Sequence, residues 1–323
     1  MRQKVLSLLS SAGKEYVSGE KISLALGISR TAVWKHIEAL RSEGYVIHSV
    51  PKRGYKLVSV PDVLYPAEVS QGLGTRVLGC KIRHYHRVDS TNNAAKKLAE
   101  EGAPEGTVVI AEQQTKGRGR MNRSWHSPAG GIWMSVILRP DVPPHKVQGI
   151  TLVAAVAVVN AIKKVTGLVP LIKWPNDIFL EGKKICGILT EMKGEVDQVN
   201  YIIIGIGLNV NSDFRQLEKE ASGAGTLAMY LGKNVDRKSL VREMLSQLEA
   251  NYFHYCREGI SSILNQWRQN NLTLGRNVVL KMGEKYFAGV AEDITPEGGL
   301  LLRDHQGCTK VFYSGEVTVT GMT

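Results

Sequence analysis

A segment with three arginines and two glycines within nine residues most constrains how this chain can fold. Residues 117–125 have the sequence GRGRMNRSW, and KWPND follows at residues 173–177. Glycine lets a backbone approach a ligand closely, and arginine offers a planar fork for carboxylate or phosphate oxygens. A cationic loop of this kind needs a rigid scaffold that holds it beside the lysine of the second segment. The two segments predict a site that brings two anions together, such as a carboxylate and a nucleotide triphosphate.

The apolar pattern around these segments predicts an α+β domain. Residues 108–112 and 132–138 have the composition of β-strands, so the arginine-rich loop lies between two strands. Runs of antiparallel strands with helices on one face are typical of α+β proteins. We therefore expect a central mixed or antiparallel sheet with helices on one face. Its other elements are an apolar helix at 147–165 and strands at 171–173, 184–191 and 201–209.

The N-terminal residues have the pattern of a winged helix-turn-helix. Gly27 suits the end of the second helix, where a positive φ is needed, and Ser29 is a suitable N-cap for the third. Two short strands flank the basic turn at residues 51–54, as in the wing of such domains. The helices are expected at residues 5–9, 20–26 and 30–43, and the strands at 45–50 and 55–58.

Charge is concentrated in this N-terminal region. Residues 1–60 carry ten Lys/Arg against four Asp/Glu, within a chain of net charge +11. A solvated basic face or a plain interaction module would have the same charge, but we favour DNA binding because of the helical pattern. We expect Trp34 to pack between helices rather than contact a base. The residues expected to contact DNA are Arg30, Thr31, Lys35, His36, Lys52 and Arg53.

Composition argues against several other classes of protein. The N-terminal apolar run is too short for a signal peptide, and the apolar stretch at 150–162 is too short for a membrane span. We therefore expect a cytoplasmic protein with no membrane partner. The four cysteines are scattered without a CxxC pair, which is typical of neither a disulfide framework nor a zinc site. They are Cys80, Cys186, Cys256 and Cys308.

The polar segments allow more than one interpretation when each is taken alone. The sequence has neither a GxxxxGK[ST] motif nor a GxGxxG motif that opens a helix, so an ATP site would have to use arginine, lysine and backbone groups. An Arg/Gly loop is also compatible with RNA binding. Ser90, Thr91 or Asn92 could cap the helix expected at 94–101, or could form a polar socket for a ligand.

Taken together, the motifs resemble the biotin–protein ligase family. The matching segments are DSTN at 89–92, Gln114, GRGR at 117–120, KWPND at 173–177 and GIGLN at 205–209. With the winged helix added, the whole chain resembles the bacterial enzymes that are both biotin ligase and biotin-operon repressor. The resemblance implies three domains, at residues 1–64, 65–271 and 272–323. It also implies that the last of them, with short strands between 276 and 319, is a small SH3-like β-barrel.

The resemblance implies a role for each matched residue. Arg118 and Arg120 would close over the ligand, and Lys173 would lie near the reacting carboxylate, so these three would carry catalysis. Asn209 would lie near the triphosphate and its Mg²⁺. The implied biotin-binding residues are Ser90, Thr91, Asn92, Gln114, Arg118, Gly119, Arg120, Lys173, Gly187, Gly205 and Gly207. The implied ATP- and adenylate-binding residues are Arg118, Arg120, Arg123, Trp125, Lys173, Asn176 and Asn209.

The implied reaction has two steps. Biotin and ATP form biotinyl-5′-adenylate, and biotin is then transferred to a lysine of the biotin-accepting domain of a carboxylase. A homodimer promoted by the adenylate would bind operator DNA and repress biotin synthesis genes. Two alternatives remain open at this point. One is a lipoate- or octanoyl-type acyl ligase with a DNA-binding domain, and the other is a ligand-sensing repressor without catalysis.

This chain departs from the family pattern at two loops. Where relatives continue the arginine-rich loop with Arg-Gly, this chain has Met121-Asn122, so one positive charge is absent. Relatives can also place a Trp on the loop that covers the adenylate. The corresponding residues here, 213–226, contain no Trp. The second departure predicts weaker stacking on adenine and weaker retention of the intermediate.

Overall fold

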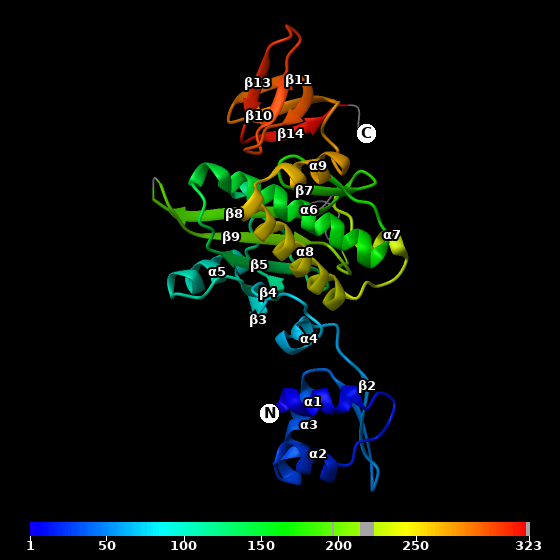
Figure 1. The fold of residues 1–323 in the computed structure, drawn as a ribbon. Coiled ribbons are helices and arrows are strands. Elements are labelled where there is room, and N and C mark those ends of the chain that lie inside the picture. The colour runs from blue at the N-terminus through cyan, green and yellow to red at the C-terminus, as the bar shows by residue number, and fades with distance from the viewer. Residues whose placement is uncertain (196, 214–222, 321–323) are drawn as a thin grey trace. The chain divides into compact units, whose positions relative to one another are not determined.

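The computed structural model describes residues 1–195, 197–213 and 223–320. The chain divides into two compact units, Met1–Val63 and Leu64–Thr323 (Figure 1). Most of the loop at 213–226, which contains no Trp to stack on adenine, lies outside the described residues.

The first unit is a helix-turn-helix followed by a β-hairpin. Ser18 and Ser29 cap the second and third helices, since their side chains accept hydrogen bonds from the backbone of Lys21 and Ala32, at 3.0 and 3.2 Å. Gly27 ends the second helix with φ 64°, as its sequence position predicted. The elements are α1 (Arg2–Ser11), α2 (Gly19–Leu26), α3 (Arg30–Ser42), β1 (Val46–Val50) and β2 (Gly54–Ser59).

The expectation for Trp34 was wrong. Its side chain is 52% exposed, whereas Val33 and Ile37 on the same helix are fully buried. Successive helical residues are about 100° apart around the axis. The stripe formed by Val33, Ile37 and Leu40 already fills the space between the helices, so Trp34 points into solvent.

The second unit is built on a seven-stranded mixed sheet with the order β3-β4-β5-β9-β8-β7-β6. Strands β3 and β4 are parallel, and every other neighbouring pair is antiparallel, which confirms the predicted central sheet. The strands are β3 (Lys81–Val88), β4 (Thr107–Gln114), β5 (Ile132–Leu138), β6 (Leu171–Lys173), β7 (Asp177–Leu180), β8 (Lys183–Gly194) and β9 (Val199–Leu208).

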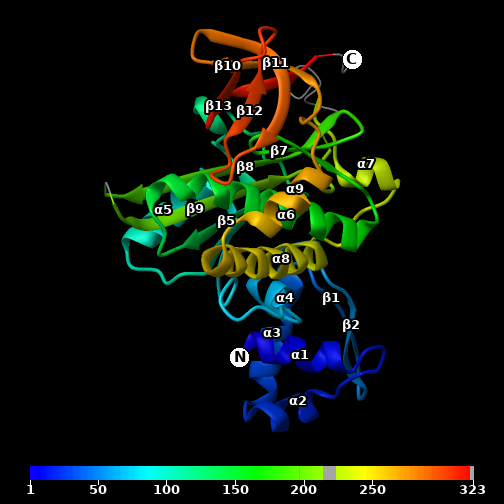
Figure 2. The same cartoon turned by 45° about the horizontal axis from the view of Figure 1, so that its top comes forward.

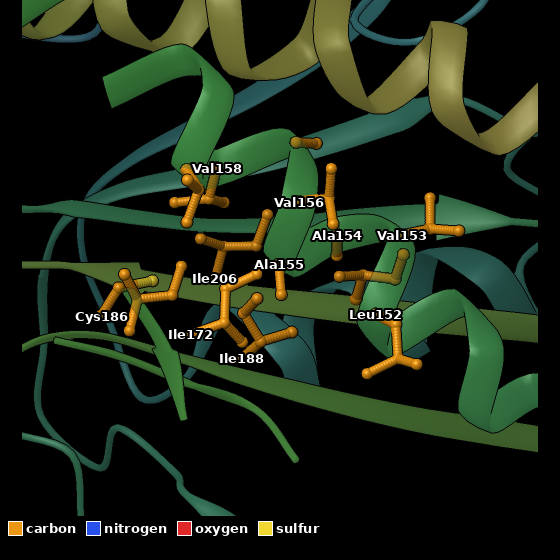
Figure 3. Close-up of a cluster of buried hydrophobic side chains, with 14 of the residues drawn as sticks. Leu152, Val153, Ala154, Ala155, Val156, Val158, Ile172, Cys186, Ile188 and Ile206 are labelled. Atoms are coloured by element: carbon orange, nitrogen blue, oxygen red, sulfur yellow. The ribbon is translucent and has the colours of Figure 1, made fainter. Parts of the chain in front are cut away.

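Helices cover both faces of this sheet, so the prediction of helices on one face was wrong. On one face, α6 (Val147–Thr166), α8 (Arg237–Glu258) and α9 (Ser261–Gln269) pack in a single core with the strands (Figure 2). Figure 3 shows α6 side chains such as Leu152 among Ile188 and Ile206 of β8 and β9.

On the opposite face, α5 (Thr91–Glu100) packs through Ala95 and Ala99 against Val109, Ile137 and Ile203. These strand residues alternate with the ones that face α6, as the period of a β-strand requires.

The 3₁₀ turn η2 (Pro144–Lys146) and α6 together form the helical segment Pro144–Thr166. This segment is longer than the apolar stretch at residues 150–162. Its length and hydropathy would suffice to cross a membrane. In this structure 72% of its most apolar window is buried inside the protein. Such burial is typical of the core helix of a soluble domain.

The C-terminal strands form an antiparallel sheet with the order β13-β12-β11-β10-β14. Trp174 connects this sheet to the central one, because its indole N–H donates to the carbonyl of Gly298 at 3.1 Å. The strands are β10 (Asn277–Met282), β11 (Lys285–Ile294), β12 (Leu300–Arg303), β13 (Thr309–Phe312) and β14 (Glu316–Val319). The remaining short helices are α4 (Pro66–Ser70), α7 (Leu227–Leu231) and the 3₁₀ turn η1 (Arg120–Asn122).

Candidate active site

One cavity of about 260 Å³ lies where the arginine-rich loop meets β6, β8, β9 and the C-terminal sheet. Every residue that the resemblance assigned to biotin or to ATP lines this cavity. They are Ser90, Thr91, Asn92, Gln114, Arg118, Gly119, Arg120, Arg123, Trp125, Lys173, Asn176, Gly187, Gly205, Gly207 and Asn209. The fold therefore brings together side chains that are up to 119 positions apart in the sequence, from Ser90 to Asn209.

A buried polar network forms one end of the cavity, at the N-terminus of α5. Ser90 is the N-cap residue, but its side chain makes no capping hydrogen bond. Thr91 N–H donates to Gln114 Oε1 at 2.7 Å, and the Ser135 hydroxyl donates to Asn92 Oδ1 at 2.6 Å. The Ser135 oxygen also lies 2.8 Å from Thr91 Oγ1, within hydrogen-bond distance. These contacts hold polar groups rigidly beside a cavity, which favours the socket interpretation over simple capping.

Gly187, Gly205 and Gly207 form one side of the cavity, which we call the glycine floor. Any larger residue at these positions would collide with neighbouring side chains. A Cβ on Gly205 would lie 2.1 Å from Asn92 Oδ1, and one on Gly207 would lie 2.5 Å from Trp125 Nε1. Gly187, which pairs with Gly207 across β8 and β9, would place a Cβ 2.9 Å from the same indole. The Trp125 ring therefore packs directly on the backbone of the sheet. Its buried Nε1–H has no hydrogen-bond partner among the described residues.

The arginine-rich loop is a compact hairpin. Gly119 N–H donates to the Arg123 carbonyl at 2.7 Å, and Trp125 N–H donates to the Gly117 carbonyl at 2.8 Å. Met121 and Asn122 at its tip have φ of 54° and 58°. Asparagine tolerates this left-handed conformation better than most residues, so Asn122 suits this turn position.

Each loop arginine contacts a different part of the surrounding structure. Arg118 lies 3.1 Å from Glu191 of β8 and donates to Asn93 at 2.9 Å. Arg120 donates to Asn176 Oδ1 at 3.1 Å and to the Gly315 carbonyl at 3.4 Å. Arg123 forms an ion pair with Glu316 of β14, and this pairing lowers the pKa of Glu316.

Two lysines lie on the facing wall. Burial lowers the pKa of Lys173, despite the opposing effect of the nearby Asp177 carboxylate. Lys184 Nζ lies 2.7 Å from Asp177 Oδ1 and 5.1 Å from the centroid of the Trp125 ring. Lys173 ends β6, and the next residue, Trp174, is 1% exposed and donates its N–H to Thr273 Oγ1 at 3.0 Å. The Lys173 backbone is thus anchored in the core.

Asn209 offers an oxygen that is compatible with a metal ion. Its Nδ2 donates to the Gly225 carbonyl at 3.1 Å, while its buried Oδ1 has no partner among the described residues. No group of three or more His, Cys, Asp or Glu in the described part of the chain could hold a metal ion. Mg²⁺ prefers oxygen and commonly takes only one or two protein ligands together with substrate phosphates. A Mg²⁺ ion held mainly by a triphosphate therefore fits these residues.

The basic residues of the first unit lie on its surface. Arg30, Thr31 and Lys35 are exposed on α3, and His36 is half-buried. Lys52 and Arg53 are exposed in the hairpin turn, where the Arg53 guanidinium stacks 4.7 Å above the Tyr16 ring. The residues expected to contact DNA thus lie on α3 and the hairpin turn.

Comparison with known proteins decides the family. The chain matches the Biotin/lipoate A/B protein ligase family at residues 85–209, an HTH domain at 2–56 and the biotin protein ligase C terminal domain at 273–319. It is 44% identical to the "Bifunctional ligase/repressor BirA" of Bacillus subtilis over 98% of both chains. The chain belongs to the family of bifunctional biotin ligase/repressors.

Similarity to more distant biotin ligases supports this assignment. The Escherichia coli bifunctional ligase/repressor is 31% identical over 98% of this chain and 96% of its own. The solved biotin protein ligase of Aquifex aeolicus, in complex with biotin and ATP, is 30% identical with a TM-score of 0.64. It covers 74% of this chain and 98% of its own.

Several groups that line or support the cavity of this biotin ligase were not predicted from the sequence. Lys184 and Glu191 lie in a strand that was predicted, but their orientation depends on the register of β8 with β9. Glu316 gave no signal, because it reaches Arg123 from 193 positions away. Ser135 is the polar residue in the otherwise apolar strand β5, and this break in the apolar pattern is a signal for a buried polar group.

Proposed function

We propose that this chain is an ATP-dependent biotin–protein ligase and a biotin-responsive repressor of biotin synthesis genes. Family membership supports the two activities. The observation that carries the ligase assignment is a cavity that joins a buried polar socket, a glycine floor and several cationic side chains. We propose the site residues in the roles that the resemblance implies, with Lys184 as an additional cation.

In the first step the biotin carboxylate attacks the α-phosphorus of ATP. An O–P bond forms, the bond to the leaving oxygen breaks, and pyrophosphate departs. The main obstacle is repulsion between anions, which preorganised cations in a dry site reduce most effectively. Arg118, Arg120 and Lys173 would supply that charge, while the socket around Thr91 and Gln114 would hold the biotin head group. Mg²⁺ bound near Asn209 Oδ1 would neutralise charge on the triphosphate.

In the second step the lysine of a biotin carboxyl carrier domain attacks the acyl carbon of the adenylate. An amide bond forms, the attacking amine releases one proton to solvent, and AMP leaves with the electron pair of the broken C–O bond. The nucleophile comes from the partner, so the cavity has only to hold the mixed anhydride and exclude water from it. The loop between Gly117 and Trp125 is suited to this because its backbone closes on itself above the floor.

We propose that the first unit binds operator DNA and that adenylate promotes a homodimer able to contact two half-sites. The charge and the exposed basic residues of α3 support DNA binding. Along with this we propose a cytoplasmic location and the three domains expected at 1–64, 65–271 and 272–323. The C-terminal sheet, whose β11 has a bulge between Ala291 and Asp293, would be an SH3-like barrel.

One experiment tests the ligase. The purified protein is incubated with ATP, Mg²⁺, a biotin-acceptor domain and either biotin, lipoate or octanoate. Mass spectrometry should show an acceptor that carries biotin. Transfer of lipoate or octanoate alone would support the acyl ligase alternative. Biotin-dependent DNA binding without any transfer would support the sensor alternative.

A further inference from the structure

Trp34 is the exposed member of the five tryptophans in this chain. Its side chain is 52% exposed, whereas Trp133, Trp174 and Trp267 are at most 1% exposed and Trp125 is half-buried. A single exposed apolar side chain is common on protein surfaces and needs no explanation by itself. The neighbours of Trp34 make its position informative.

Trp34 lies on the basic face of α3. Arg30, Thr31, Trp34 and Lys35 are all exposed, and their spacing of one, four and five positions places them on one side of the helix. The other side, which includes Val33, is buried in the unit. The same unit carries the local excess of positive charge. A large apolar ring thus lies among groups suited to phosphate and base contacts.

The base edges of the major groove offer one apolar feature, the C5-methyl group of thymine. Arginine, lysine and threonine reach the polar atoms of the groove, but an indole ring can bury the methyl group. This inference builds on the proposed repressor function. We propose that Trp34 packs on a thymine methyl group in the operator and sets the base preference at that position.

The test removes single methyl groups from the DNA. The operator is first located by footprinting with the full-length protein, biotin and ATP, and each thymine is then replaced by uracil. Wild-type affinity should fall roughly 4-fold at one position of a half-site, the effect of one buried methyl group. Trp34→Ala should bind the operator at least about 5-fold more weakly and should lose the uracil effect. A wild-type protein that is indifferent to every uracil would overturn the proposal.

Two controls separate base contact from other effects. Lys35→Ala should bind more weakly to all sequences, with a smaller salt dependence, and should keep the uracil effect. Trp34→Phe should keep part of the uracil effect. Its unfolding temperature and ligase activity should equal those of the wild type. A Trp34→Ala variant that retained the full uracil effect would also overturn the proposal. If the wild type bound no specific site at all, the repressor function itself would fail.

Discussion

At the level of single residues, Lys173 has the features of an electrostatic catalyst. Its backbone is fixed by the buried Trp174, and the cavity that it lines is also lined by three loop arginines. Burial lowers its pKa, which means that the surroundings solvate the charge poorly and that a bound anion would relieve this cost. Such a group contributes most when negative charge develops beside it.

We predict that Lys173→Ala slows adenylate formation much more than it weakens biotin binding. Loss of one preorganised cation should lower kcat on the order of 100- to 1000-fold. Pyrophosphate release and a biotin titration of the same protein measure the two effects. Lys183→Ala, which changes a neighbouring lysine outside the cavity lining, is the control. Release at the wild-type rate in Lys173→Ala would remove Lys173 from the mechanism and leave Lys184 as the ammonium of the site.

The lowered pKa also predicts a pH dependence. The pKa of Lys173 is lower than the ordinary lysine value of 10.5, so its charge is lost at a lower pH than that of an ordinary lysine. The adenylation rate should therefore fall as the pH rises toward 10.5. Lys173→Arg, whose guanidinium stays charged, should shift the fall to higher pH. Rates of pyrophosphate release at a series of pH values compare the two proteins, and identical profiles would contradict the assignment.

At the level of elements, sequence patterns predicted most of the strands and helices that hold the site. The spacing of apolar residues and the residues typical of helix ends were sufficient to predict α2, α3 and the strands that flank the arginine-rich loop. They failed for the side of the sheet that α5 covers, because β4 is apolar on both faces and its sequence does not say which helix lies where. The contacts of Glu191 and Glu316 escaped prediction because they depend on register and on long-range packing.

The glycine floor predicts a sharp effect of a small substitution. Gly205→Ala would place a methyl group 2.1 Å from Asn92 Oδ1, so Asn92 must move and its hydrogen bond with Ser135 must break. We expect biotin affinity to fall at least about 10-fold, since the socket loses its geometry. Gly74→Ala, where an added Cβ meets nothing within 4 Å, is the matched control. Calorimetric titration with biotin measures both, and equal affinities would contradict the socket.

The arginine-rich loop should control how long the intermediate stays bound. Arg118 ties the loop to β8 through Glu191, so Arg118→Gly should release this tie and let the adenylate escape faster. Looser acceptor choice should follow, because free adenylate acylates exposed lysines. Asn122→Gly, which suits the positive φ of the tip, should leave the off-rate near that of wild type. An unchanged off-rate in Arg118→Gly would count against the loop as a lid.

At the level of the whole molecule, Glu112 connects the start of the second unit to its core. Its carboxylate accepts from Leu64 N–H at 2.8 Å and pairs with Arg237 at 2.9 Å. Burial alone would raise the pKa of Glu112, but a hydrogen bond with His84 and the charge of Arg237 lower it below 4.5. The stability that Glu112 contributes is therefore present above about pH 4.5 and is lost as the pH falls further.

We predict that Glu112→Gln destabilises the second unit by about 3–5 kcal/mol at neutral pH, because the buried charge of Arg237 loses the opposite charge of the carboxylate. The difference from wild type should shrink as the pH falls below about 4.5, because protonation then begins to remove the stabilising charge of Glu112. Urea unfolding at pH 7 and near pH 4 tests this, with Glu297→Gln at an exposed carboxylate as the control. A difference that stayed constant with pH would show that the charge of Glu112 is unimportant.

The contacts from Gly315 and Glu316 to Arg120 and Arg123 matter for directed evolution of this enzyme. A mutant library confined to residues 85–209, the segment that matches the ligase family, would leave one wall of the cavity constant. Randomising 313–317 together with 118–123 would let both walls change as a pair. Selection for bulkier carboxylic acids should then recover coupled changes, such as exchanged charges at 123 and 316, more often than single ones.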